Sequence, residues 1–556
     1  MARINLAYAE PLTGVPSVAR LMRAPLLLRR DDAGRYVGPG EQGRVVQTSL
    51  QAFDRTRRAT RFDIAAIEDL EFQLLQRLHR AGLLGVYIVV APGDLRGGVD
   101  LRPRGDDTLH LVVHVAIVQA LRVNVTGYKA HAGLLRAELL RASPIQPGPA
   151  SLLRAATLQD YIDRLDARGA RSVGVEVSPG TIPDAVILDY RVLRRRPWLV
   201  YAQLSNTGTT QTRRWIERFG LIDADLSGLG DALDLDYTTA GFDRVNALDA
   251  AYTVPLGVVA RRSLRIEAVW QRYTASNVGL GILGFTGTTG GGGVALETEL
   301  LRRRRLVVAS VLGARLLHVS AANGLAGTSG SAWLRLPYVG VTLHRSNAQT
   351  RVRGRLTLTG GSTGASSAQR DALGRYAADA HWILLKGQAF ARVDLDHWLA
   401  PRHAPGAPGN VLVLRAGVQD AFGRRLLPTE EAVLGGLGTV RGYAQSLVAG
   451  DDAQWGSIEY DLHPFRLGAR KPRALRDLSV GAFVDGGHVT PNHPLSYERS
   501  AAMLGTGLAL RASFASGLVL QADWGVALRA VGALASAGQP AARGSSAFNV
   551  VATWSF

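Results

Sequence analysis

Two kinds of hydrophobic pattern divide the chain near residue 197. In two stretches before that point, apolar residues recur every three or four positions, as they do on the buried face of an amphipathic helix. From Pro197 onward this spacing disappears, and segments of about ten residues alternate apolar and polar positions between clusters of Gly, Asn, Asp, Ser and Thr. The pattern predicts small helix-covered sheets first and a long run of β-strands after them.

The helical stretches belong to two similar segments, 63–93 and 150–180, which are offset by 87 residues. In the first segment, Asp63 is placed to cap a helix and Gly82 to end it. The β-branched run at 86–90 then predicts a strand. Self-similarity of this kind indicates that one supersecondary unit occurs twice.

The second segment repeats the same order, with a helical stripe at 158–165, Gly169 as its end and a strand at 173–177. We therefore expect two α+β modules, at 1–118 and 119–196, each with one sheet covered by helices. Further strands are expected in these modules at 109–118 and 184–192, at 121–125 and, less distinctly, at 4–8.

The last strand is the clearest example of the alternating pattern. One of its faces would carry Phe548, Val550, Ala552, Trp554 and Phe556. The polar faces of this and other strands carry charged residues such as Arg415, Glu459 and Asp523, whereas an arginine facing the middle of a bilayer would cost about 2–4 kcal/mol. We therefore assign the apolar faces to lipid, with Trp554 and Phe556 near its interface, and the polar faces to a wet lumen.

Residues 197–556 accommodate about sixteen such strands when strands of about ten residues alternate with short turns and long loops. The predicted fold is α+β modules followed by a transmembrane antiparallel β-barrel of about sixteen strands. A soluble β-sandwich would also alternate, but it is disfavoured because no helical segment follows that could cover a sheet and because aromatic residues gather near strand ends.

Composition narrows the function classes. The chain has no cysteine, which excludes disulfides, thiolate metal sites and cysteine nucleophiles. Its net charge of +18 would suit nucleic acid, but the arginines are spread over the whole length and do not gather on one module. We therefore expect no nucleic-acid partner. No apolar stretch reaches the ~18 residues of a membrane-spanning helix.

A long connection at 424–452 separates two of the predicted strands. It contains the tetrapeptide Val440, Arg441, Gly442 and Tyr443. The next strand but one carries Phe483, Asp485 and Gly487, and alternation turns Phe483 and Asp485 toward the lumen.

With these two motifs, the terminal aromatic strand and the two preceding repeats, the chain resembles the two-partner secretion transporters of the hemolysin and filamentous-hemagglutinin secretion type. That branch belongs to the superfamily of outer-membrane barrels with periplasmic POTRA domains. The resemblance implies that the two modules are POTRA-like, that loop 424–452 folds back into the lumen, and that Arg441 meets Asp485 on the barrel wall. It also implies that Trp554 and Phe556 form a C-terminal signal for the barrel assembly machinery.

Physical chemistry supports the Arg441–Asp485 contact. A loop tip in a wide lumen would bury little apolar area, so a directional anchor is needed, and a guanidinium offers a planar fork to a carboxylate. Gly442 permits a backbone geometry closed to other residues, and Tyr443 and Phe483 would pack around the pair. A partly hydrated pair would contribute about 1 kcal/mol and would act by positioning.

The sequence predicts no catalytic residue, no cofactor and no metal site. There is no Walker A, HExxH or GxSxG motif. The glycine-rich stretch 287–293 is expected to be a flexible loop. Asp394, Asp396 and His397 could be imagined as metal ligands, but alternating lumenal polar residues explain them better.

We expect an outer-membrane transporter, not an enzyme, which secretes a partner exoprotein from the periplasm to the cell surface through its barrel. Its partners would be the unfolded exoprotein, outer-membrane lipid and the barrel assembly machinery, and its N-terminal modules would lie in the periplasm. One alternative is an assembly factor that inserts other barrels; a second is a passive porin, which would need no periplasmic modules.

The start of the chain departs from the family pattern. Residues 1–6 enter a folded-looking pattern without the apolar stretch of a secretory signal. Either a signal or plug helix is missing from the start, the numbering is that of a mature chain, or the protein stays inside.

Overall fold

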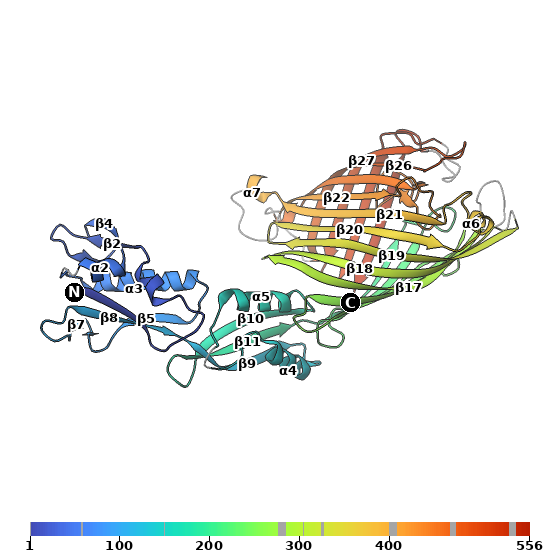
Figure 1. Cartoon of the computed structure of the whole chain (residues 1–556). Coiled ribbons are helices and arrows are strands. Elements are labelled where there is room, and N and C mark those ends of the chain that lie inside the picture. Colours follow the sequence, from blue (N-terminus) through green and yellow to red (C-terminus); the bar gives the residue numbers. More distant parts are fainter. Residues whose placement is uncertain are drawn as a thin grey trace. The chain divides into compact units, whose positions relative to one another are not determined.

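The computed structural model describes residues 2–56, 59–148, 151–275, 285–303, 305–323, 327–399, 409–466, 474–532 and 541–556. The chain forms two compact units, Met1–Arg196 and Pro197–Phe556 (Figure 1). No helix among the described residues is long and apolar enough to cross a membrane.

The first part of the N-terminal unit is built on a three-stranded sheet in the order β1-β8-β5, with β1 parallel and β5 antiparallel to the central β8. Its elements are β1 (Arg3–Tyr8), α1 (Val18–Met22), α2 (Leu50–Thr56), α3 (Ile64–Arg80), β5 (Val86–Val90) and β8 (Thr108–Val115). The indistinct strand expected at 4–8 is therefore present, as β1.

Helix α3 begins and ends for the reasons that its sequence suggests. The Asp63 carboxylate accepts a hydrogen bond from the Ala66 N–H at 2.6 Å, and Gly82 has a left-handed φ of 84°. Leu70, Leu74 and Leu78 recur at spacings of four on one face of the helix and are at most 1% exposed. They pack on the sheet in one apolar core.

This module also contains two small sheets that the periodicity did not predict. The first has the order β3-β2-β4 and the second is the pair β6-β7. Their strands are β2 (Leu26–Arg30), β3 (Tyr36–Val37), β4 (Arg44–Thr48), β6 (Leu95–Arg96) and β7 (Val99–Asp100). Strands of two to five residues are too short for a period of two to be recognised in sequence.

The second module has the same plan, with the sheet order β10-β11-β9. Its elements are β9 (Ile117–Gly127), α4 (Ala132–Ala142), α5 (Ala155–Asp166), β10 (Arg171–Pro179) and β11 (Ala185–Arg194). Helix α4 was not anticipated. Helix α5 follows the predicted stripe, and its Tyr161 hydroxyl donates to the Leu139 carbonyl of α4 at 2.7 Å, which ties the two helices together.

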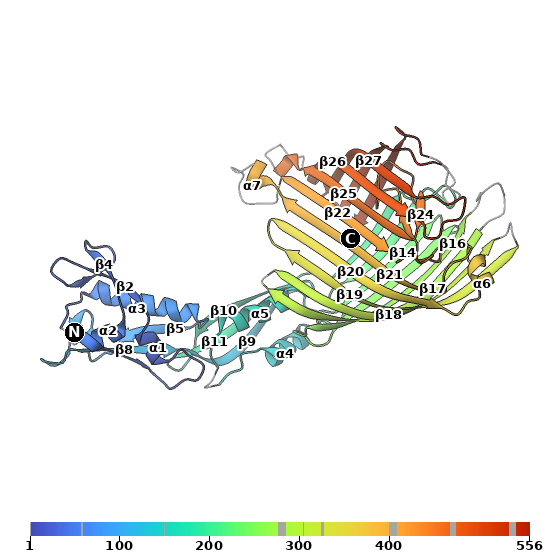
Figure 2. The same cartoon turned by 45° about the horizontal axis from the view of Figure 1, so that its top comes forward.

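The C-terminal unit is a closed antiparallel barrel of sixteen strands, which confirms the predicted fold class (Figure 2). Its strands are β12 (Trp198–Ser205), β13 (Ile216–Asp223), β14 (Ala232–Ala240), β15 (Val245–Pro255), β16 (Arg262–Ala275), β17 (Phe285–Arg303), β18 (Leu306–Asn323), β19 (Thr328–Ser346), β20 (Thr350–Thr363), β21 (His381–Asp394), β22 (Asn410–Asp420), β25 (Asp452–Leu462), β26 (Leu475–Thr490), β27 (Ala501–Phe514), β28 (Leu518–Ala527) and β29 (Ser546–Ser555). The connections hold α6 (Ser367–Ala372), α7 (Asp396–Leu399), β23 (Ala432–Leu434), β24 (Val448–Gly450) and the 3₁₀ helix η1 (Pro464–Arg466).

Alternation along each strand sorts residues between the outside and the lumen. On β26, Val480 and Val484 are 44% and 50% exposed, whereas Phe483 and Asp485 are 2% and 0% exposed. On β29, Trp554 is 48% exposed and therefore lies on the apolar outer face. The exterior is thus apolar and the interior polar, the reverse of a soluble protein.

The barrel closes between its first and last strands, β12 and β29. Five residue pairs connect them, from Tyr201–Ser555 to Ser205–Val551. The backbone N–H of Phe556 extends this seam by donating to the Val200 carbonyl at 2.9 Å. The C-terminal aromatic residues therefore lie on the outside at the seam.

The prediction that 287–293 forms a flexible loop is wrong. These residues lie within β17, where Gly287–Gly293 pair with Tyr273–Glu267 of β16 and with Ala321–Arg315 of β18. Backbone hydrogen bonds to two neighbours hold the run, and the ring of Tyr273 covers Gly287 so closely that a Cβ there would overlap it. Glycine hides the side-chain alternation that identifies a strand.

The module built on β1, β5 and β8 should respond to pH through Glu71 on α3. Desolvation, with a smaller contribution from Glu68, raises the pKa of Glu71 from 4.5 to about 7. Ionisation of Glu71 therefore lowers the free energy of unfolding of the module. The loss is absent below pH 4.5, grows between pH 4.5 and 7, and is complete above pH 7. After allowance for its partial exposure, Glu71→Gln should stabilise the module at pH 8 by about 1 kcal/mol.

Hydrogen exchange of α3 in the full-length protein measures this effect. Protection should rise in the variant at pH 8 and stay unchanged near pH 4. Glu41→Gln, at an exposed position of the same module, should have no effect at either pH. Equal protection of the Glu71 variant and the parent at pH 8 would contradict the assignment.

Candidate functional site

The candidate site is formed by the connection between β22 and β25, residues 421–451, which we call the lumenal loop. Its strands β23 and β24 pair antiparallel from Ala432–Gly450 to Leu434–Val448 and form a stem. Beyond the stem, the tip contacts inward-facing residues of β25, β26 and β28. The loop therefore turns back into the barrel.

Arg441 at the tip is 2% exposed and lies among three carboxylates. Its Nε and Nη2 donate to Asp485 Oδ2 and Oδ1 at 2.7 and 2.9 Å. Its Nη1 donates to Glu459 Oε2 at 2.6 Å and to Asp523 Oδ1 at 3.1 Å. We call Glu459, Asp485 and Asp523 the acidic cage.

Further contacts complete the environment of Arg441. Its backbone N–H also donates to Asp485, at 3.0 Å, and Nη2 donates to Ser457 Oγ at 3.1 Å. The ring of Phe483 lies under the guanidinium, with its centroid 3.4 Å from Cζ. Burial alone would lower the pKa of Arg441, but Asp485 and Glu459 raise it above its ordinary value, so the side chain keeps its charge.

The structure corrects the expected strength of this anchor. A partly hydrated pair with one carboxylate was expected, whereas Arg441 has three carboxylate partners that are each at most 1% exposed. Removing one member of such a buried group costs about 3–5 kcal/mol because the others are left without a counter-charge. The anchor therefore contributes to stability as well as to position.

Three glycines let the tip approach the wall at backbone distance. Gly442 has a φ of 92°, and a Cβ there would lie 2.8 Å from the carbonyl carbon of Val526. On the wall, a Cβ on Gly525 would lie 2.5 Å from the Gly442 nitrogen, and one on Gly505 would overlap the Arg441 carbonyl. The backbone of the tip and the backbone of the wall are thus complementary in shape.

Apolar packing holds the tip as well, so the expectation that it buries little apolar area is wrong. Val440 and Tyr443 are 0% and 2% exposed. They belong to an apolar cluster with Leu434, Leu447, Val448, Ala453, Val489, Ala501, Met503, Ala527 and Val531. The Tyr443 hydroxyl donates to the Arg529 carbonyl at 2.7 Å and accepts from the Leu504 N–H at 3.1 Å. A Cβ on Gly487 would lie 2.9 Å from Val440, so this wall residue also makes room for the tip.

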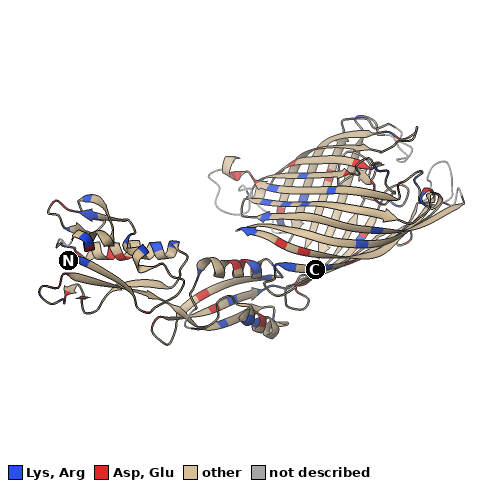
Figure 3. Cartoon of the chain, in the orientation of Figure 1, with Lys and Arg blue, Asp and Glu red and all other residues tan. Residues whose placement is uncertain are grey.

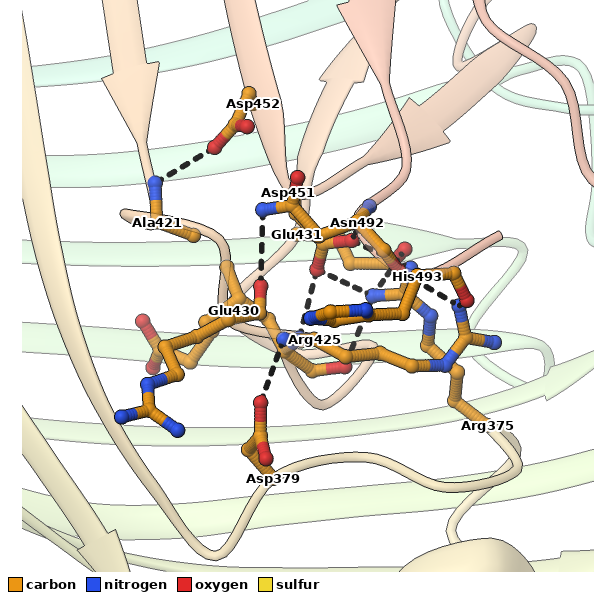
Figure 4. Close-up of polar contacts among 12 residues, drawn as sticks. Arg375, Asp379, Ala421, Arg425, Glu430, Glu431, Asp451, Asp452, Asn492 and His493 are labelled. Carbon is orange, nitrogen blue, oxygen red and sulfur yellow. Dashed lines mark hydrogen bonds and ion pairs between the residues drawn. The ribbon is translucent and has the colours of Figure 1, made fainter. Parts of the chain in front are cut away.

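A second set of ion pairs fixes the base of the loop (Figure 4). We call Arg375, Arg425, Asp451 and Glu498 the base network. Arg375, from the connection that holds α6, donates through Nη1 and Nη2 to Asp451 at 2.6 and 2.7 Å. Arg425 donates through both terminal nitrogens to Glu498 at 2.7 Å each. The network joins the loop base to two other connections at the same end of the barrel.

Asp451 is the centre of this network and is fully buried. Besides Arg375, it accepts hydrogen bonds from the backbone N–H groups of Leu426 at 2.7 Å and Asn492 at 2.6 Å. Glu431 lies 2.9 Å from Arg375, and burial raises its pKa to about 7. Burial raises the pKa of Glu498, but the hydrogen bonds from Arg425 lower it. The pKa of Glu498 is therefore below its ordinary value. Sequence reasoning missed this network because no spacing pattern links three separate connections.

The residues considered as metal ligands have another role. Asp396 accepts hydrogen bonds from the backbone N–H groups of Gly409 and Asn410 at 2.7 and 2.8 Å. The Asp394 carboxylate accepts from the Asp396 N–H at 2.8 Å. These carboxylates therefore shape the connection between β21 and β22. Asp396 and His397 lie in α7 and not on a strand, so the alternation along a strand that was expected for this group does not explain them.

Comparison with known proteins identifies the fold. No protein-family model and no curated protein matches the sequence. Among solved structures, CdiB from Escherichia coli is 16% identical with a TM-score of 0.65, and the match covers 98% of this chain and 94% of that chain. CdiB from Acinetobacter baumannii is 14% identical with a TM-score of 0.62, covering 99% and 95%.

BamA from Haemophilus ducreyi lacking POTRA domains 1–3 is 13% identical with a TM-score of 0.52, and the match covers 90% of this chain and 95% of that chain. At these identities the likeness establishes the fold. The chain has the architecture of POTRA-like modules followed by a sixteen-stranded barrel.

Removing the Arg441 side chain should free the tip of the loop. Because the chain has no cysteine, Val440→Cys introduces a single thiol at a position that is fully buried. A water-soluble maleimide should label it slowly in the parent background and at least about tenfold faster with Arg441→Ala, since about 3–5 kcal/mol of anchoring is lost. Arg424→Ala, which removes an exposed arginine of the same loop, should leave labelling slow. Slow labelling in both variants would contradict the anchoring role.

Disrupting the base network should affect a different part of the loop. Arg375→Gln leaves the buried Asp451 without its bidentate partner, so hydrogen exchange should accelerate at 424–434 and 491–500 by tenfold or more. Arg499→Gln changes an exposed arginine beside Glu498 and should leave exchange unchanged. If Arg375→Gln accelerates exchange no more than Arg499→Gln, the base is held by other contacts.

Proposed function

We propose that this chain secretes a partner exoprotein across the outer membrane through the lumen of its barrel. The observation that carries the proposal is that the lumenal loop is attached to the wall by side-chain contacts centred on Arg441, while the barrel strands pair without it. The loop can therefore leave the lumen without opening the wall. Releasing and restoring such a plug is what passage of a polypeptide requires.

The comparisons support an outer-membrane transporter of this architecture, and both secretion transporters and an assembly factor are among the similar structures. CdiB proteins are two-partner secretion transporters, and their structures match 98–99% of this chain. The likeness to BamA is weaker, with a TM-score of 0.52 against 0.65. The presence of two N-terminal modules also suits a dedicated secretion transporter better than an assembly factor, which usually has more than two such modules.

The exposed sheet edges of the N-terminal unit would capture the unfolded exoprotein. β5 lies at the edge of one sheet and β10 at the edge of the other, so each offers unpaired backbone groups to an extended segment. No nucleotide-binding motif occurs in the sequence, and folding of the exoprotein outside would supply the driving force.

We place the barrel in the outer membrane and the N-terminal unit in the periplasm. The apolar exterior would contact outer-membrane lipid, and the barrel assembly machinery would insert the chain with Trp554 and Phe556 as its C-terminal signal. The end of the barrel at which Trp198 begins β12 would face the periplasm. The base network would then lie at the outer surface.

Two alternatives remain distinguishable. An assembly factor would share the fold, as BamA does, but would act on many outer-membrane barrels. A passive porin would need an open lumen, whereas the lumenal loop and its apolar cluster occupy part of this one. Comparison of secreted and outer-membrane proteomes after gene deletion separates the three. Loss of one exoprotein supports secretion, a general fall in barrels supports assembly, and loss of neither fits a porin.

Arg441→Ala should abolish or strongly reduce secretion while the barrel still inserts, because strand pairing does not involve the loop tip. Export is measured as exoprotein in the medium, and insertion by heat-modifiable migration of the variant from outer-membrane fractions. Arg424→Ala serves as the matched control and should secrete normally. Normal secretion by the Arg441→Ala variant would contradict the proposed role of the anchor in transport.

A further inference from the structure

Four arginines form a basic patch on the lumenal wall, which we call the arginine stripe: Arg351, Arg353, Arg355 and Arg392. The first three alternate along β20 with outward residues, and Leu356 and Leu358 on the outer face are 49% and 41% exposed. The three arginines therefore point inward, and they are solvent-exposed there. Arg392 lies on β21, directly opposite Arg351.

The stripe places like charges close together. Alternate residues of a strand are about 7 Å apart, and directly opposed residues of neighbouring strands have Cβ atoms about 5 Å apart. Arg351 and Arg392 are such an opposed pair, and opposed like charges destabilise a sheet. The arrangement therefore favours an anion in contact with it.

Of the four arginines, Arg392 has two carboxylates near it, those of Asp394 and Asp461, and both act on it electrostatically. No hydrogen bond or ion pair links any of the four to a carboxylate among the described residues. The nearest inward carboxylates across β22, Glu459 and Asp461, lie within 3.1 Å of Arg511 instead. The stripe thus differs from the acidic cage, where every charge is matched.

Inward-facing arginines on β13, β16 and β18 have carboxylate partners. Arg218 lies 2.6 Å from Asp236, and Arg265 and Arg315 lie 3.5 and 3.9 Å from Glu267. In Figure 3, blue segments gather on the strands around β20 toward the end of the barrel that carries α7. The lumen therefore carries paired charges on β13, β16 and β18 and arginines without a bound carboxylate on β20 and β21.

The stripe also lies at a particular end of the lumen. β20 begins at Thr350 and β21 ends at Asp394, so all four arginines are within about six residues of the barrel end at which β12 begins. A chain that enters the barrel from the N-terminal unit would therefore meet the stripe near the start of its path through the lumen.

We propose that the arginine stripe binds acidic segments of the polypeptide that passes through the barrel, and so selects for an exoprotein with aspartate- and glutamate-rich stretches. This rests on the proposed function, because it names the substrate class of the same lumen. Guanidinium groups at strand spacing suit an extended acidic chain, whose own alternate side chains repeat at about 7 Å. Several exposed contacts of modest strength hold such a chain without trapping it.

The test uses the full-length protein in detergent or nanodiscs and three fluorescent peptides of equal length, rich in Asp and Ser, Lys and Ser, or Ser alone. At physiological salt the parent protein should bind the acidic peptide best, and binding should weaken as salt rises. Replacement of Arg351, Arg353 and Arg355 together by Gln should weaken binding of the acidic peptide about tenfold.

The matched control replaces Arg218, Arg265 and Arg315 by Gln, which removes the same charge from the lumen at sites that already have carboxylate partners. This variant should retain binding within about twofold. Equal weakening in both triple variants would overturn the proposal, because net charge alone would then explain it. So would a parent protein that does not prefer the acidic peptide.

These measurements do not depend on secretion. If the chain proves to insert barrels, the proteome comparison will contradict the proposed secretion function. Binding of the acidic peptide to the stripe can still be measured in that case. If secretion is established and the stripe variant binds the acidic peptide as the parent does, only the assignment of the stripe falls.

Discussion

Burial of one guanidinium among three carboxylates organises the interior of this barrel. Glu459, Asp485 and Asp523 come from three different strands and are almost fully buried. Without Arg441, Glu459 would keep Arg511 and Arg415, but Asp485 and Asp523 would be uncompensated charges in a confined space, which is unfavourable for both the wall and the loop. The loop tip therefore completes the wall electrostatically, and the glycines at 442, 505 and 525 allow it to come close enough to do so.

The two ends of the lumenal loop are held by different means. At the tip, one arginine is shared by three strands of the wall and is supported by apolar packing around Val440 and Tyr443. At the base, two arginine–carboxylate forks join the loop to neighbouring connections and not to strands of the wall. This arrangement lets the tip detach while the base remains fixed, so that the loop would move about its base and return to the same place.

Charge is distributed unevenly around the wall of the lumen that we propose as the route of the exoprotein. On β20 and β21 the wall offers arginines without a bound carboxylate, and on β25, β26 and β28 it offers a cage of carboxylates that is already satisfied by Arg441. An acidic segment would be held by the first region and would find only Arg415, Arg441 and Arg511 in the second. Because exposed contacts are individually weak, such a path can guide a chain without holding it permanently.

The sequence by itself determined the helices α3 and α5, the presence of a barrel of about sixteen strands, and which faces of its clearest strands turn inward, because side-chain periodicity is a local property. It also pointed to Arg441 and Asp485, through a resemblance to a family, and the structure places them in contact. It could not reveal that Glu459 and Asp523 complete the cage, because those residues meet only when β25, β26 and β28 curve around the tip. It misassigned 287–293, since glycines carry no side chains and the hydrogen bonds that hold them in β17 come from two other strands. The base network and the unpaired state of the arginine stripe likewise depend on which strands and connections become neighbours, and only the closed barrel decides that.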